Sequence, residues 1–137
     1  MRREDVFRLP VYRRFSDLDP LGHVNNVVFY DYLQEARVQM LTRLGHMDVD
    51  TLAQVVVRQE MRFRKPLLLR PEPIVIETWI GTVGNSSYSV EYRIIDEVGD
   101  LAAEGTTLLA CVDLESGRPI RLEPELRALL LDLTINE

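Results

Sequence analysis

The 137-residue chain has one cysteine, Cys111, and only two histidines. A single cysteine cannot form a disulfide within the chain, which is typical of a protein from a reducing compartment. Two widely spaced histidines and one cysteine do not make a zinc site, so no metal is predicted. The length corresponds to a single domain over residues 1–137, with a core large enough to fold without metal or disulfide support.

Several other signals are missing. No apolar run approaches the roughly 20 residues that span a bilayer, and no signal-peptide core follows the charged residues 2–5. We therefore expect a cytoplasmic protein without a membrane partner. The net charge of −6 disfavours general nucleic-acid binding, which usually requires a basic surface. Neither a G-x-S-x-G elbow nor a glycine-rich phosphate loop occurs, which disfavours an α/β-hydrolase mechanism.

The longest periodic segment predicts a helix from residue 24 or 25 to residue 44. Asn25 or Asn26 suits the N-cap position, and Gly45 suits the end of the helix. Apolar side chains occupy nearly its whole circumference, which is typical of a helix that other elements surround. Twenty residues span about 30 Å, so this helix should cross the whole domain.

The remaining segments alternate between apolar and polar residues and predict strands. Pro10 indicates that the first strand lies at a sheet edge or begins after that residue, and Gly84-Asn85 indicates a two-residue hairpin turn. Strands joined by tight turns form an antiparallel sheet. The expected fold is α+β, with about five strands curled around one long helix. The expected strands are 6–15, 53–64, 74–83, 86–95 and 101–113, followed by a short helix over 124–133.

The segment over residues 16–26 carries the densest group of reactive side chains. It holds Asp17, Asp19 and His23 and ends in Asn25-Asn26, just before the predicted helix. Free N–H groups at a helix start can polarise a carbonyl oxygen. A carboxylate beside them could attack that carbonyl or activate water. On composition alone, a polar loop with capping and turn-forming residues is the favoured explanation. The density of polar groups argues against it, because Asp, His and two Asn are more than a cap requires.

The motif D-L-D-P-L-G-H-V-N-N at residues 17–26, followed by Tyr30, Tyr32 and Glu35-Ala36-Arg37, resembles the opening of a known family. The family is the hotdog-fold acyl-CoA thioesterases of the 4-hydroxybenzoyl-CoA thioesterase-like group. Weaker similarity continues through residues 62–67, 84–88 and 117–126. Residues 70–73 depart from the family, whose members commonly have a Gly-Asp turn there. The resemblance implies a curled antiparallel sheet on one long helix, as the periodicity also predicts.

The resemblance implies hydrolysis of acyl-CoA thioesters to free acid and coenzyme A. It also implies that no cofactor takes part, because coenzyme A belongs to the substrate. It assigns the catalytic carboxylate to Asp19, as nucleophile or as general base for water. The backbone N–H that binds the thioester oxygen maps to about Asn26. His23 either contacts the substrate, orients a carboxylate or is bonded to the loop backbone. Asp17 is interpreted as structural.

Further residues are candidates for substrate binding. The strand alternation places Arg58, Arg62 and Arg64 on one strand face, with Lys65 next to them. This strip suits the phosphates of coenzyme A, and a solvated strand face is the alternative. The other candidate substrate contacts are Asn25, Tyr30 and Ser87. Packing is the alternative for Tyr30. Ser87 would reach a site across a subunit interface, and the alternative is an ordinary surface serine of the hairpin.

A homodimer or a homotetramer built as a dimer of dimers is implied by the resemblance, with sites at subunit interfaces. Pairing would also cover the open edges of a single sheet. The preferred substrate class is aliphatic acyl-CoA, followed by aromatic acyl-CoA. The alternatives are an acyl-carrier-protein thioesterase, which the negative charge disfavours, and a non-catalytic module that binds acyl thioesters.

Overall fold

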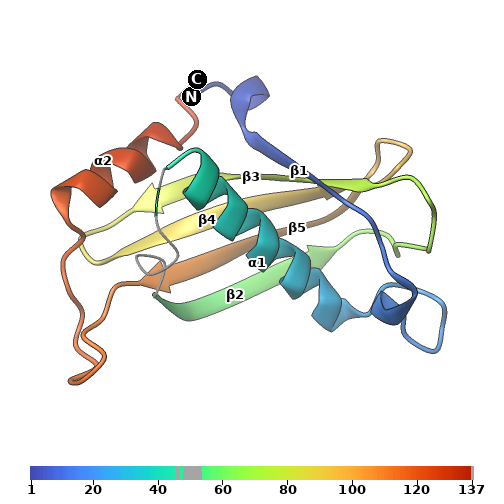
Figure 1. Cartoon of the computed structure of the whole chain (residues 1–137), viewed down its shortest axis with the longest axis horizontal. Coiled ribbons are helices and arrows are strands. Elements are labelled where there is room, and N and C mark those ends of the chain that lie inside the picture. The colour runs from blue at the N-terminus through green and yellow to red at the C-terminus, as the bar shows by residue number, and fades with distance from the viewer. Residues whose placement is uncertain (46, 48–53, 137) are drawn as a thin grey trace.

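The computed structural model describes residues 1–45, 47 and 54–136, which form one five-stranded sheet and two α-helices (Figure 1). All neighbouring strands are antiparallel, in the order β1-β3-β4-β5-β2. The predicted α+β class and antiparallel sheet are confirmed. The elements are the 3-10 turns η1 (Arg3–Asp5) and η2 (Phe15–Asp17), the helices α1 (Asn26–Arg43) and α2 (Pro124–Asp132), and the strands β1 (Phe7–Val11), β2 (Val55–Phe63), β3 (Ile74–Val83), β4 (Ser87–Ile95) and β5 (Leu101–Ala110).

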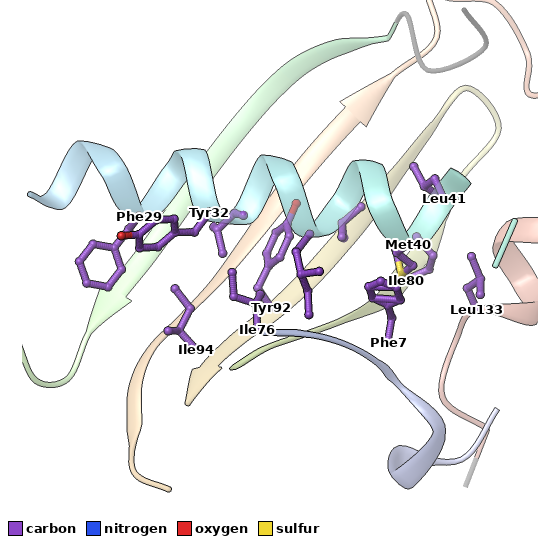
Figure 2. Close-up of a cluster of buried hydrophobic side chains, with 14 of the residues drawn as sticks. Phe7, Phe29, Tyr32, Met40, Leu41, Ile76, Ile80, Tyr92, Ile94 and Leu133 are labelled. Carbon is purple, nitrogen blue, oxygen red and sulfur yellow. The ribbon is translucent and has the colours of Figure 1, made fainter. Parts of the chain in front are cut away.

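Helix α1 lies across one face of the curled sheet, which we call the helix face (Figure 1). Asn25 is its N-cap, as the sequence predicts, because its side-chain oxygen accepts a hydrogen bond from the N–H of Val27 at 2.9 Å. Phe29 and Met40 project from the helix toward the sheet (Figure 2), and Leu33 between them is completely buried. Burial of these side chains fixes the helix on the sheet.

The prediction that other elements surround this helix is wrong for the single chain. Asp31, Gln34 and Glu35 are exposed on α1. These residues are three and four positions apart and therefore form one polar stripe on the side away from the sheet. The sheet covers only the opposite side, because helix α2 packs beside β3 instead of over α1 (Figure 1).

The two edge strands show the largest differences from the sequence prediction. Pro10 does lie in an edge strand, where it pairs with Val75. Strand β1 ends at Val11 rather than at residue 15, because the chain turns into η2. The predicted start of the second strand, Ala53, lies outside the described residues, and β2 begins at Val55.

A β-bulge in β2 overturns the predicted alternation of its first residues. Val56 pairs with Leu109, whereas Arg58 pairs with Leu108, so Val57 is the extra residue. Leu109 is buried on the helix face. Val56 therefore shares that face, where a strict alternation predicts Val57.

The remaining boundaries agree closely with the prediction. Strand β3 covers 74–83 as expected, while β4 begins at Ser87, so the β3–β4 connection has three residues and not two. Strand β5 ends at Ala110, three residues early, and the residues after it pair with a returning segment of the chain: the carbonyl of Cys111 accepts from the N–H of Ile120, and the N–H of Asp113 donates to the carbonyl of Arg118, both at 2.8 Å. In the described part of the chain, no helix is long and apolar enough to cross a membrane.

The two ends of the described chain meet beside α2 (Figure 1). The amino group of Met1 donates to the carbonyl of Thr134 at 2.7 Å, and the N–H of Asn136 donates to the carbonyl of Met1 at 2.9 Å. These bonds join the start of the chain to the segment after α2, and that segment forms a parallel bridge from Thr134 to Ile80 of β3.

Replacing Leu33 by Ala should lower the free energy of unfolding by about 2–5 kcal/mol, because it leaves a cavity between α1 and the sheet. Gln34→Ala, at the adjacent exposed position, is the matched control and should change it by less than about 0.5 kcal/mol. Urea unfolding of both variants measures the difference, and equal losses would contradict the packing described for α1.

Candidate active site

The loop before α1 folds back on itself through short-range hydrogen bonds. The N–H of Asp19 donates to the carbonyl of His23 at 2.8 Å, and Leu18 and Val24 form a β-bridge. Gly22 between them has φ +81°, a left-handed conformation that favours glycine. The turn therefore holds Asp19 and His23 opposite each other directly before the helix.

Asp17 anchors this loop to α1. Its carboxylate is almost fully buried and accepts hydrogen bonds from the Tyr32 hydroxyl at 2.6 Å and from the backbone and side chain of Arg14 at 2.9 and 3.1 Å. Its backbone carbonyl accepts from the N–H of Asn25 at 2.9 Å. Tyr32 and Asn25 belong to the helix and its cap, so one residue fixes the loop relative to the helix start. This agrees with the structural role interpreted for Asp17.

These contacts determine the ionisation states of Asp17 and Tyr32. Burial acts to raise the pKa of Asp17, but the hydrogen bonds from Tyr32 and Arg14 outweigh it and hold that pKa below its ordinary value. Burial and the adjacent carboxylate both raise the pKa of Tyr32, so its hydroxyl remains a donor. At neutral pH the loop is therefore held by an ionised carboxylate.

Asp19 lies at a cavity of about 270 Å³ that also contains the start of α1. Its Oδ1 atom accepts hydrogen bonds from the N–H groups of Leu21 at 2.9 Å and His23 at 3.3 Å, which fix the direction of the carboxylate. The three predicted catalytic residues all reach this cavity. The complete lining is Asp19, His23, Val24, Asn26, Phe29, Phe63, Arg64, Lys65 and Pro66.

The helix start offers a free donor at the same cavity. The N–H of Val27 donates to the Asn25 side chain, and that of Val28 donates to the Asn25 carbonyl. The N–H of Asn26 donates to no acceptor within the described residues. A free amide at a helix N-terminus, close to a carboxylate, suits a reaction in which a carbonyl oxygen gains negative charge.

Two candidate substrate contacts lie on α1 or its cap and do not line the cavity. The side-chain oxygen of Asn25 is already bonded to the N–H of Val27. Tyr30 is half-buried on the helix, one residue after the cavity-lining Phe29. In the single chain Asn25 therefore caps the helix, and neither residue lines the cavity.

Ser87 lies far from the cavity in the same chain. It pairs with Ala110, which pairs with Val55 at the beginning of β2. The cavity-lining Phe63 is at the other end of β2, roughly 25 Å along the strand. Only a neighbouring subunit could bring Ser87 to a site, as the sequence interpretation requires.

The cations at the cavity are paired with acidic residues. Arg64 Nη2 contacts Glu104 Oε1 at 2.5 Å, and Lys65 Nζ contacts Asp96 at 2.6 Å and Asp100 at 3.1 Å. The hydrogen bonds to these carboxylates raise the pKa of Lys65. Burial acts to raise the pKa of Asp96, but the bonds from Lys65 and the turn backbone lower it. Lys65 thus connects the end of β2 to the β4–β5 turn.

Arg62 lines a different, larger cavity of about 580 Å³ on the outer face of the sheet. Its strand neighbour is Glu104, and its side chain is directed away from α1. Three arginines and three glutamates line this cavity, so their charges offset each other. The smaller cavity is the better candidate site because it combines Asp19, His23 and a helix N-terminus.

Phe29 and Phe63 form an apolar wall that sequence reasoning did not assign to the site. Their ring centroids are 5.1 Å apart in an edge-to-face arrangement. Phe29 was expected only as a core residue of the helix. The available signal was its position three residues after Asn26, on the same side of the helix.

Within the described residues, no group of three or more His, Cys, Asp or Glu side chains gathers as a metal site.

Comparison with known proteins identifies the superfamily to which the chain belongs. Residues 13–130 match the model of the Thioesterase-like superfamily, and the chain belongs to that superfamily. The resemblance predicted from the motif at residues 17–26 is therefore confirmed.

Individual relatives carry more specific names. The chain is 28% identical to the long-chain acyl-CoA thioesterase FadM of Escherichia coli K12, covering 80% of this chain and 86% of FadM. It is 27% identical to the acyl-CoA thioester hydrolase YbgC of Escherichia coli O6:H1, covering 87% of each. A crystallised thioesterase from Thermus thermophilus, complexed with coenzyme A and Zn, is 33% identical over 92% of each chain, with a TM-score of 0.80.

Tyr32→Phe should lower the free energy of unfolding by about 1–3 kcal/mol at pH 7, because a buried carboxylate loses a donor. Since the pKa of Asp17 is lowered by folding, its stabilising contribution is complete above its ordinary value near 3.8 and is lost as pH falls through the folded value. The difference between variant and parent should therefore shrink at pH 3. Urea unfolding at both pH values tests this, and a loss independent of pH would contradict the role of Asp17.

Proposed function

We propose that this protein hydrolyses acyl-CoA thioesters to a free acid and coenzyme A. The observation that carries the proposal is the shared cavity of Asp19 and the free N–H of Asn26. The names of FadM and YbgC and the coenzyme A bound to the Thermus thermophilus thioesterase support the substrate class.

In the proposed reaction the thioester oxygen accepts a hydrogen bond from the Asn26 N–H, which stabilises the charge that develops there. In the first route Asp19 removes a proton from water, the new C–O bond forms, the C–S bond breaks, and the thiolate takes up the proton. In the second route an Asp19 oxygen attacks the carbonyl, releases the thiolate and forms a mixed anhydride that water then hydrolyses. Neither route requires a cofactor.

The other residues of the cavity have proposed supporting roles. The backbone N–H of His23 orients the Asp19 carboxylate, and its imidazole, which lines the cavity, contacts the substrate. Arg64 and Lys65 line the cavity and would bind the phosphates of coenzyme A. Their positive charges are partly neutralised by the acidic residues with which they form ion pairs. Arg62 and Ser87 would contribute only from a neighbouring subunit.

Asp19→Asn should lower kcat/KM at least about a hundredfold, because the amide can neither remove a proton nor attack the carbonyl. Asp31→Asn, an exposed position on α1, is the matched control and should retain the parent rate. Free-thiol release measured over aliphatic and aromatic acyl-CoAs gives both values and the acyl preference.

Turnover by Asp19→Asn within a few-fold of the parent would show that Asp19 is not the catalytic carboxylate. Binding of acyl-CoA without any thiol release by the parent would indicate a non-catalytic binding module instead. Thiol release from acyl-carrier-protein thioesters, with none from acyl-CoAs, would show that the substrate is an acyl-carrier protein and not acyl-CoA. Transfer of ¹⁸O from labelled water into Asp19 during turnover would assign the anhydride route.

We further propose that the chain works as a homodimer or as a homotetramer, with β2 at the subunit interface. Strand β2 is an unpaired edge, and its Val55, Val56 and Val57 are 41%, 44% and 59% exposed. An exposed apolar edge is a template for pairing with another strand. An interface along β2 would lie beside the Asp19 cavity, because Phe63 at the end of β2 lines that cavity.

Light scattering should give a mass of twice or four times 15.8 kDa. Val57→Glu should reduce this mass and the activity together, because it buries a charge at the proposed interface. Leu131→Glu introduces the same charge at an exposed apolar position of α2, which packs beside β3 and not beside β2, and should change neither. A fully active monomer would contradict the proposal.

A further inference from the structure

Arg37 is a buried cation on the sheet side of α1. Its residue is 8% exposed, and its Nη1 donates to the Tyr92 hydroxyl at 3.0 Å. That hydroxyl donates to Thr107 Oγ1 at 3.0 Å, which donates to Gln59 Oε1 at 3.2 Å. Figure 2 shows Tyr92 rising from β4 toward the helix. The chain of hydrogen bonds therefore runs from the helix across β4 and β5 to the free edge strand.

The described residues provide no carboxylate for this guanidinium. None of their ion pairs includes Arg37, and all three partners in its network are neutral. An uncompensated buried charge is costly, and buried arginines are usually paired. Among the described residues, Tyr92 is the one side-chain hydrogen-bond partner of Arg37, which leaves N–H groups of the guanidinium for another acceptor.

Three side chains of β2, which we call the track, lie between this network and the Asp19 cavity on the same face of the sheet. Phe63, Met61 and Gln59 pair with Ala103, Gly105 and Thr107 of β5, and all three lie on the helix face. Phe63 lines the Asp19 cavity, Met61 packs against the core, and Gln59 joins the Arg37 network. Four residues along a strand span about 13 Å. The track is therefore apolar near the site of the reaction and cationic at its far end.

On the basis of the proposed function, we propose that this track selects acyl groups that carry a carboxylate at the end remote from the thioester. The substrate would be the coenzyme A monothioester of a dicarboxylic acid. Its methylene chain would contact Phe63 and Met61, and its free carboxylate would pair with Arg37 through the guanidinium N–H groups that Tyr92 does not use. The carboxylate would supply the counter-charge that the described residues do not provide.

The parent protein tests the proposal without any substitution. Thiol release is measured on pairs of acyl-CoAs that match in carbon number, one ending in a methyl group and one in a carboxylate. At the chain length that fits, kcat/KM should be higher for the carboxylate by about tenfold or more, since hydrogen bonds to charged groups contribute this much. Faster hydrolysis of the methyl-ended member at every length overturns the inference but leaves the proposed function intact. Absence of thiol release from every substrate overturns both.

Arg37→Met then assigns the preference to one side chain. The carboxylate-to-methyl ratio of kcat/KM should fall by about tenfold to a hundredfold. Arg43→Met, the same substitution at an exposed position of the same helix, should leave the ratio unchanged. A purely structural role of Arg37 would lower both rates equally and keep the ratio, which overturns the proposal.

Two further outcomes are decisive. Loss of the oligomer in Arg37→Met with an unchanged ratio would show that a carboxylate of a second subunit, and not the substrate, pairs with Arg37. If Arg37→Met does not fold, Gln59→Leu replaces it, because Gln59 is exposed at the outer end of the network. Gln59→Leu should lower the same ratio, and an unchanged ratio in this variant overturns the proposal.

Discussion

The geometry of the site depends on the burial of Asp17. An ionised carboxylate removed from water must be hydrogen-bonded, and its donors come from Tyr32 on the helix and from Arg14 before the loop. Its backbone carbonyl also receives the N–H of the helix cap, Asn25. These bonds fix the loop in a single position relative to the start of the helix. Asp19, two residues further on, is thereby placed at the same cavity as the free N–H of Asn26.

The second constraint is that the sheet covers only one side of α1 and that, within the described residues, the outer edge of β2 has no strand beside it. The cavity, its apolar wall at Phe63 and the outer end of the Arg37 network all lie along this strand. Lys65 ties the end of β2 to the β4–β5 turn through Asp96. A free edge of this kind is usually covered in native proteins, which connects the proposed subunit interface with the proposed catalytic site.

Local signals in the sequence were sufficient for most of the fold and for the centre of the site. Capping by Asn25 and the range of β3 follow from short-range rules, and the motif at residues 17–26 located the cavity. Long-range pairing was not accessible in the same way. The bulge at Val57, the distance of Ser87 from the cavity and the carboxylate partner of Arg64 depend on strand register. The sequence prediction missed the exposed stripe on α1. Apolar residues occupy most of the helix circumference, so Asp31, Gln34 and Glu35 were not recognised as one polar side.

The most direct test of the central claim is a crystal structure of the Asp19→Asn variant with an intact acyl-CoA. The account predicts the thioester oxygen within hydrogen-bond distance of the Asn26 N–H, with the residue-19 side chain facing the carbonyl carbon. A thioester bound on the outer face of the sheet, with the cavity before α1 empty, would contradict it.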